Sequence, residues 1–157
     1  MTPTPAVLAP SLDLVRHYNP GIGKGLRHLK TYPGSPEIAR RLLRNQDRLI
    51  AVERHPEEVK TLRRRFGRTS RVTVLDQDGY LALKGLLPPA ERRGLVLIDP
   101  PFEKPDEFEK LLKGVKSARR RWATGIYAIW FPIKAREPVD AFLRELVAEG
   151  ARRVLLA

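Results

Sequence analysis

The run Asp99-Pro100-Pro101-Phe102 has side chains suited to chemistry on the exocyclic amine of a nucleic-acid base. The lone pair of that amine is delocalised into the ring, so its nitrogen is a poor nucleophile. The Asp99 carboxylate and a backbone carbonyl could accept both N–H hydrogens and restore electron density for methylation. Proline removes N–H donors and stiffens the loop, and the Phe102 ring could stack on a base that has left its helix. The alternative is a proline-rich turn in which Asp99 is only a turn former.

This run follows residues 94–98, whose sequence Gly-Leu-Val-Leu-Ile predicts a buried central strand. Open α/β sheets bind ligands at the carboxyl ends of such strands. Glu53 ends another predicted strand, where an acidic side chain can accept hydrogen bonds from both ribose hydroxyls of a nucleoside cofactor.

Asp78 and Gly79 follow a third predicted strand. The Asp78 carboxylate could accept a hydrogen bond from an adenine amino group, and Gly79 would let the backbone approach closely. Either Glu53 or Asp78 alone could instead cap the following helix. Three strands that each end in an acid together outline the rim of an S-adenosylmethionine (SAM) site.

Other kinds of site have little support in the sequence. The chain has no cysteine and three histidines without metal-ligand spacing, so we expect no metal site. Ser35 lacks the G-x-S-x-G context of a hydrolase nucleophile. Gly21-Ile-Gly23-Lys-Gly25 looks like a cofactor loop, but a helix rather than a strand precedes it, so we expect a basic loop there.

Charge is the strong compositional signal. Thirty Lys and Arg face eighteen Asp and Glu, which gives a net charge of +12 and a pI near 10.6. Such an excess favours a polyanionic partner through phosphate neutralisation. The arginines cluster at 40–48, 63–68 and 119–121. Any single cluster could be a solvated helix face, whereas the whole excess favours nucleic acid.

The elements that must position these residues alternate along the chain, as in a parallel α/β sheet. Strands are predicted at 48–52, 71–75, 94–98, 125–131 and 152–156. Helices are predicted at 10–18, at 56–66, 79–86, 105–118 and 138–149, and from 36 after an N-cap at Ser35. The apolar stripe of the helix that starts at 36 is predicted to be Ile38, Leu42 and Leu43. We expect one domain, with a helix and basic loop over 1–31 and the α/β core over 32–157. The longest apolar segment is too short to span a membrane, and we expect a cytoplasmic protein.

Several blocks, in order, resemble the RlmJ family of bacterial methyltransferases, which methylate adenine N6 in 23S ribosomal RNA with SAM. They are Tyr32-Pro-Gly-Ser-Pro36, Ile38-Ala-Arg-x-Leu-Leu-Arg44, Glu53-x-His55-Pro56, Asp78-Gly79, Arg92-Arg93-Gly94-Leu-x-Leu-Ile-Asp-Pro-Pro101 and Ala123-Thr-Gly-x-Tyr-Ala-x-Trp130. The resemblance runs from about Leu12 to the end of the chain.

The resemblance implies a Rossmann-like class I methyltransferase fold that lacks its first strand, its glycine-rich cofactor loop and its C-terminal part. It implies that Asp99, Pro100 and Phe102 hold the target adenine. It also implies that Ser35, Glu53, Asp78, Gly79 and Asp99 contact the cofactor. The expected partner is 23S ribosomal RNA, with no membrane. The alternatives are a DNA adenine-N6 methyltransferase and a non-catalytic RNA-binding remnant of the family.

Overall fold

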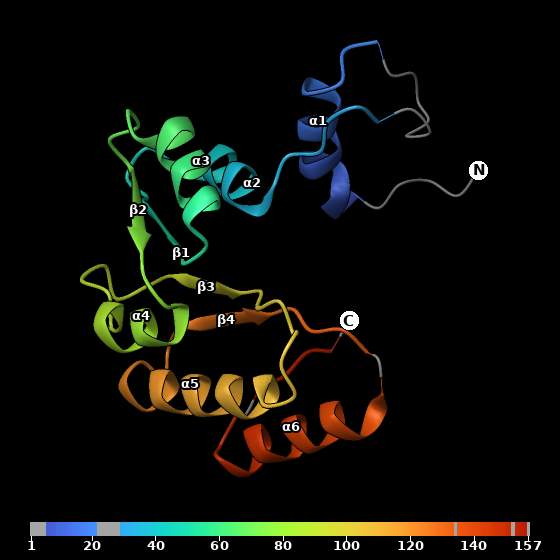
Figure 1. The fold of residues 1–157 in the computed structure, drawn as a ribbon, viewed down its shortest axis with the longest axis vertical. Coiled ribbons are helices and arrows are strands. Elements are labelled where there is room, and N and C mark those ends of the chain that lie inside the picture. Colours follow the sequence, from blue (N-terminus) through green and yellow to red (C-terminus); the bar gives the residue numbers. More distant parts are fainter. Residues whose placement is uncertain (1–5, 22–28, 134, 152, 157) are drawn as a thin grey trace. The chain divides into compact units, whose positions relative to one another are not determined.

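The computed structural model describes residues 6–21, 29–133, 135–151 and 153–156 (Figure 1). The chain divides into two compact units, Met1–Asp76 and Gln77–Ala157. Each contains parallel strands with helices, so the α/β class predicted from the sequence is confirmed. The glycine loop considered above lies outside the described residues, apart from Gly21.

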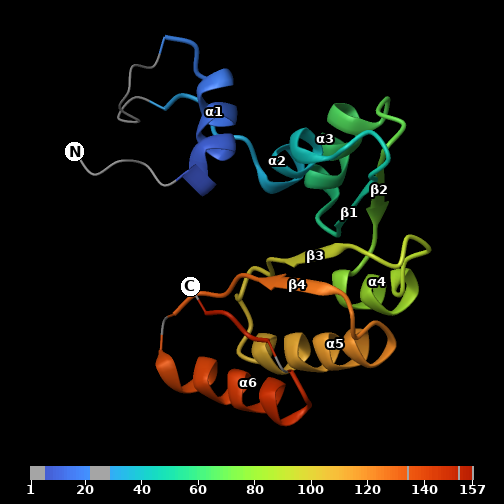
Figure 2. The same ribbon diagram turned by 180° about the vertical axis from the view of Figure 1, so that it is seen from behind.

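The first unit is built around two parallel strands, β1 (Leu49–Glu53) and β2 (Val72–Asp76). Their register pairs the last residues of both, Glu53 with Asp76. The connecting helix α3 (Pro56–Phe66) contacts both strands (Figure 2) and buries Val59 and Phe66. The other elements of the unit are a short 3-10 helix η1 (Ala6–Leu8), α1 (Ala9–His17) and α2 (Ser35–Leu42).

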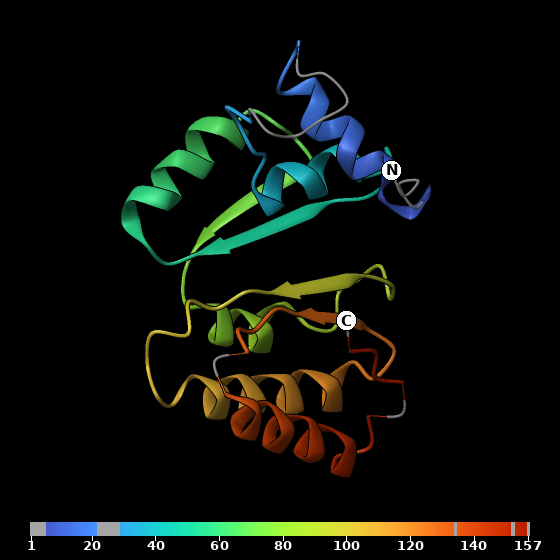
Figure 3. The ribbon, with the colours of Figure 1, turned by 90° about the vertical axis from the view of Figure 1, so that its right-hand side faces the viewer.

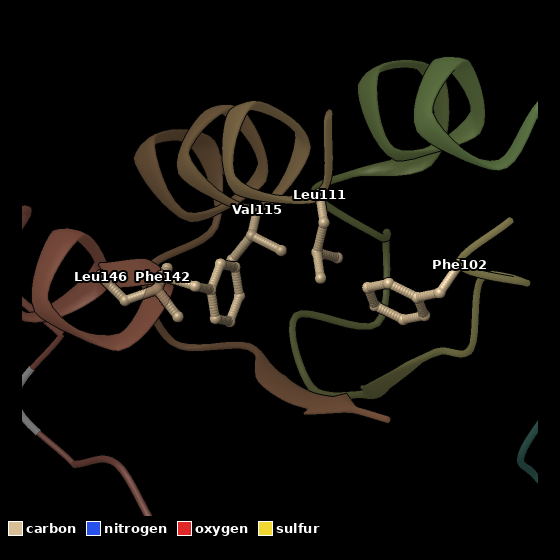
Figure 4. Close-up of a cluster of buried hydrophobic side chains, with 5 residues drawn as sticks. All are labelled: Phe102, Leu111, Val115, Phe142 and Leu146. Atoms are coloured by element: carbon tan, nitrogen blue, oxygen red, sulfur yellow. The ribbon is translucent and has the colours of Figure 1, made fainter. Parts of the chain in front are cut away.

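The second unit holds the strands β3 (Leu95–Ile98) and β4 (Ile126–Ile129), which also pair in parallel. Its helices are α4 (Gly79–Leu86), α5 (Glu107–Arg121) and α6 (Arg136–Ala148). All three lie on the same side of the β3–β4 pair (Figure 3). The core between helices and strands is a cluster of five buried side chains: Phe102, Leu111, Val115, Phe142 and Leu146 (Figure 4).

The strand at 94–98 is less buried than predicted. Leu95 and Leu97 are 63% and 53% exposed, whereas Val96 and Ile98 are half-buried. Successive side chains of a strand point to opposite faces, and the helices of this unit cover only one face. Within the described residues β3 pairs with β4 alone. It is therefore not a central strand there, contrary to the prediction from the sequence.

Three smaller predictions are wrong. The N-cap of α2 is Gly34 rather than Ser35, because the carbonyl of Gly34 accepts hydrogen bonds from the amides of Glu37 and Ile38 at 3.0 and 3.1 Å. Leu42, predicted to belong to the apolar stripe of that helix, is 55% exposed. Residues 153–156 form no strand, since no described strand pairs with them, and Leu155 is 91% exposed.

Candidate functional site

The carboxyl ends of β3 and β4 place Asp99 in an exposed position. The amide of Trp130 donates to the carbonyl of Ile98 at 2.9 Å, which continues the ladder just past both strands. One residue further along this register, Asp99 lies beside Trp130. Asp99 and Pro101 are exposed and Pro100 is half-buried. The carboxylate is therefore accessible on a loop with two consecutive residues that cannot donate a backbone hydrogen bond.

Phe102 occupies a different environment from the one its predicted role requires. Its side chain is only 9% exposed and belongs to the core cluster of Figure 4. Its ring centroid lies 4.9 Å from that of Phe108. The backbone of Phe102 has a φ of +49°. This left-handed conformation is energetically unfavourable for any residue other than glycine, and it occurs most often in functional loops. To stack on a base, the ring would have to turn out of the core.

Trp130 is the exposed aromatic residue beside this loop. Its side chain is 55% exposed, and its ring meets that of Phe102 edge-on, with centroids 6.4 Å apart. Sequence reasoning assigned it no role, although it lies in the predicted strand 125–131 and is the last residue of one of the family-like blocks. The signal that could have found it was its position near the carboxyl end of the predicted strand 125–131, the next predicted strand after the one before Asp99.

Glu53 is fixed at the end of β1. Its Oε1 accepts hydrogen bonds from the backbone amides of Arg54 and His55 at 2.7 and 2.8 Å. Asp76 is its register partner on β2 and is exposed. The local hydrogen bonds orient the Glu53 carboxylate at the strand end, the position from which an acidic side chain binds ribose hydroxyls in Rossmann-like folds.

Asp78 is the N-cap of α4, as the capping interpretation of this residue predicted. Its Oδ1 accepts from the amides of Tyr80 and Leu81 at 2.9 and 3.1 Å. A side chain added at Gly79 would meet no atom within 4 Å, so the packing of the chain does not require glycine there. The space left open beside Gly79 is compatible with the close approach of a ligand.

Tyr80 anchors this end of α4 to α5. Its hydroxyl donates to Glu107 Oε1 at 2.8 Å, and Glu107 is buried. Burial raises the pKa of the Tyr80 hydroxyl, and the hydrogen bond to Glu107 raises it further. Tyr80 is therefore neutral, and its hydrogen bond to Glu107 links α4, which Asp78 caps, to α5, which follows the Asp99 loop.

Ser35 is exposed at the first position of α2. It and Glu53 belong to the first unit, whereas Asp78, Gly79 and the Asp99–Phe102 loop belong to the second. Within the described ranges, no group of three His, Asp or Glu side chains could hold a metal ion.

The arginine cluster at the end of α5 serves the fold. Arg121 donates to the carbonyls of Leu83 and Lys84 at 2.8 and 2.6 Å, near the C-terminus of α4. Arg119 donates to the carbonyls of Glu149 and Gly150 beyond the end of α6. Carbonyls at helix ends lack intrahelical donors, and cations near them are stabilising. Both arginines are thus engaged by helix ends rather than by solvent alone.

Comparison with known proteins gives three findings. A family model described as ribosomal RNA large subunit methyltransferase D, RlmJ, matches residues 1–157. The chain is similar to proteins named ribosomal RNA large subunit methyltransferase J from Escherichia coli (strain K12) and Haemophilus influenzae (strain ATCC 51907 / DSM 11121 / KW20 / Rd). Identity is 42% over 151 and 154 residues, which cover 96% and 98% of this chain and 52% and 53% of those proteins.

The third finding is a solved structure. A crystal structure of a Legionella pneumophila str. Philadelphia 1 protein, assigned to the DUF519 family, superposes with a TM-score of 0.85 at 32% identity. The match covers 95% of this chain and 54% of that one. The chain spans about half the length of the curated relatives it matches. None of the helices in the described ranges is long and apolar enough to cross a membrane.

Proposed function

Because the chain belongs to the RlmJ family of ribosomal RNA large subunit methyltransferases, we propose that it takes part in methylating N6 of an adenine in 23S ribosomal RNA. The substrate class follows from the two relatives, whose names state a ribosomal RNA large subunit methyltransferase. The family also favours RNA over DNA and an enzyme over a non-catalytic remnant. A ribosomal RNA substrate is consistent with a cytoplasmic location of the protein.

The observation that carries the proposal is the accessible carboxylate of Asp99 at the carboxyl end of β3. We assign Asp99 and the carbonyl of Pro100 as acceptors for the two hydrogens of the adenine amine. Accepting both hydrogens increases electron density on the nitrogen that attacks the methyl group. Phe102 supports this loop from the core, and its predicted stacking on the base stays a prediction.

SAM supplies the electrophilic methyl group when it is bound. Of this chain's residues, Glu53 would accept hydrogen bonds from ribose, and Asp78 and Gly79 would contact the adenine end. The ordered Glu53 carboxylate and the open space beside Gly79 support this assignment. Ser35 and Asp99 are the other proposed cofactor contacts. We further propose that both compact units belong to one Rossmann-like methyltransferase domain.

We expect Asp99→Asn to abolish methyl transfer to 23S ribosomal RNA while leaving the protein folded. The amide removes the charge and can turn a donor toward the amine. The test measures transfer of labelled methyl from SAM, together with circular dichroism. Glu103→Gln is the matched control, because it removes a charge from an exposed side chain of the same loop and should retain activity. A wild-type rate for the Asn variant would refute the role of Asp99.

A further inference from the structure

A buried carboxylate in the first unit gathers three arginines. Glu37, in the first turn of α2, is only 4% exposed. Arg40 binds it through two hydrogen bonds, Nε to Oε2 at 3.0 Å and Nη2 to Oε1 at 2.5 Å. Arg41 Nε donates to Oε1 at 3.1 Å, and Arg65 Nε on α3 donates to Oε2 at 3.4 Å. The Tyr18 hydroxyl also donates to Glu37 Oε1.

Tyr18 holds the two outer arginines in place. The guanidinium carbons of Arg41 and Arg65 each lie 5.8 Å from the centroid of its ring. The Nη2 atoms of both donate to the Tyr18 hydroxyl, at 3.5 and 3.3 Å. Cation–π contacts and hydrogen bonds therefore fix two guanidinium groups around one phenol ring.

The cluster carries more positive charge than its own carboxylate requires. Hydrogen bonds from Arg40, then Tyr18 and Arg41, hold the pKa of Glu37 well below its usual range, so Glu37 stays ionised. Arg40 alone makes a two-hydrogen-bond ion pair with it. Three guanidinium groups and one carboxylate leave an excess of two positive charges.

The excess positive charge lies on two arginine side chains that are exposed to solvent. The side chains of Arg41 and Arg65 are 41% and 50% exposed. Each uses its Nε and Nη2 within the cluster, and in the described part of the chain the Nη1 of each has no hydrogen-bond partner. A guanidinium group presents its donors in a planar fork that matches a phosphate. Since both groups are already held, little side-chain entropy remains to be lost on binding.

We propose that Arg41 and Arg65, held around Tyr18 by Glu37, form a binding site for one phosphate of the substrate RNA. The identity of the polyanion rests on the proposed function. The site lies wholly in the first unit. It gives a particular role to two arginines out of the general basic excess, and it makes Tyr18 and Glu37 positioning residues.

The test is the salt dependence of affinity for a 23S ribosomal RNA fragment. The logarithm of the association constant falls with the logarithm of salt concentration by about 0.7–0.9 per phosphate contact. The double variant Arg41→Gln, Arg65→Gln should lower this slope by about one such contact. The slope changes of the single variants Arg41→Gln and Arg65→Gln should not add up to that of the double variant, because both arginines bind one phosphate. Arg63→Gln, Arg64→Gln on the same helix removes the same charge from exposed positions and should change the slope less.

Tyr18→Phe tests the positioning without changing charge. It removes the hydroxyl to which both Nη2 atoms donate, and we expect weaker RNA binding at every salt concentration. Equal slope changes in the two double variants, an unchanged slope in the Arg41, Arg65 variant, or wild-type affinity for Tyr18→Phe would overturn the proposal. Methyl transfer is measured separately: its absence from the wild-type protein would refute the proposed function but not the phosphate site.

Discussion

At the scale of single residues, two aromatic side chains near Asp99 differ in exposure to solvent, and the sequence does not predict this difference. Phe102 lies in the core and Trp130 is open to solvent. Both follow a strand, and periodicity places each near a sheet edge. The backbone of Phe102 is left-handed, with a φ of +49°, and its ring packs against that of Phe108 in the core. A local sequence pattern does not report such a φ angle at a residue other than glycine.

We expect Trp130 to stack on an unpaired adenine of bound RNA. Trp122 is the other tryptophan, 5% exposed, with its Nε1 donating to the carbonyl of Arg92 at 3.3 Å. In a Trp122→Phe protein the tryptophan fluorescence, excited selectively over that of tyrosine, therefore comes from Trp130 alone. An RNA hairpin with an unpaired adenine should quench it more than the same hairpin with an abasic site. Base–aromatic stacking contributes about 1–3 kcal/mol, so Trp130→Ala should weaken this binding by at least about five-fold.

The control is Trp130→Phe in the otherwise unchanged protein, where the remaining emission comes from buried Trp122. Its fluorescence should respond little to either hairpin. Equal quenching by the adenine and abasic hairpins in the Trp122→Phe protein would rule out stacking by Trp130.

At the scale of elements, the order and most bounds of the strands and helices were predicted correctly, except that residues 153–156 form no strand. β1, β2 and β3 each begin one residue later than predicted, and α3 and α4 have the predicted bounds. Alternating apolar runs and proline or glycine breaks carry that information. Burial was predicted less well: the apolar run of β3 suggested cover on both faces, whereas helices of its unit cover one. Which face a neighbour covers depends on residues far away in the chain.

The contact between α4 and α5 depends on a glycine. A Cβ at Gly114 would lie 2.9 Å from Tyr80 Cδ1 and 3.4 Å from Leu83 Cδ1. The Tyr80 ring has little freedom to move because its hydroxyl is bound to Glu107. We expect Gly114→Ala to destabilise the protein by about 1–2 kcal/mol through overpacking, measured by denaturant unfolding.

Gly85→Ala is the matched control in α4. A Cβ there meets nothing within 4 Å, so the substitution should be neutral or stabilising by up to about 1 kcal/mol. Equal effects of the two substitutions would show that the packing of α4 on α5 is not as tight as these distances indicate.

At the scale of the whole molecule, function was predicted from blocks of residues rather than from composition. The net charge of +12 indicates a polyanionic partner, but the arginines of the chain differ in role. Arg119 and Arg121 donate to carbonyls at helix ends, whereas Nη1 of Arg41 and of Arg65 has no hydrogen-bond partner among the residues that the structure describes. No linear pattern separates these roles, because each depends on contacts with a different element. The family-like blocks, which include Asp99, carried the information on substrate and reaction.

The product of the reaction tests the central claim most directly. The protein is incubated with 23S ribosomal RNA and methyl-labelled SAM, the RNA is digested to nucleosides, and the labelled nucleoside is identified by mass spectrometry. We predict that the label appears as N6-methyladenosine and that the Asp99→Asn protein yields none. Label on another base or another atom of adenine, or N6-methyladenosine formed equally by the Asp99→Asn protein, would contradict it.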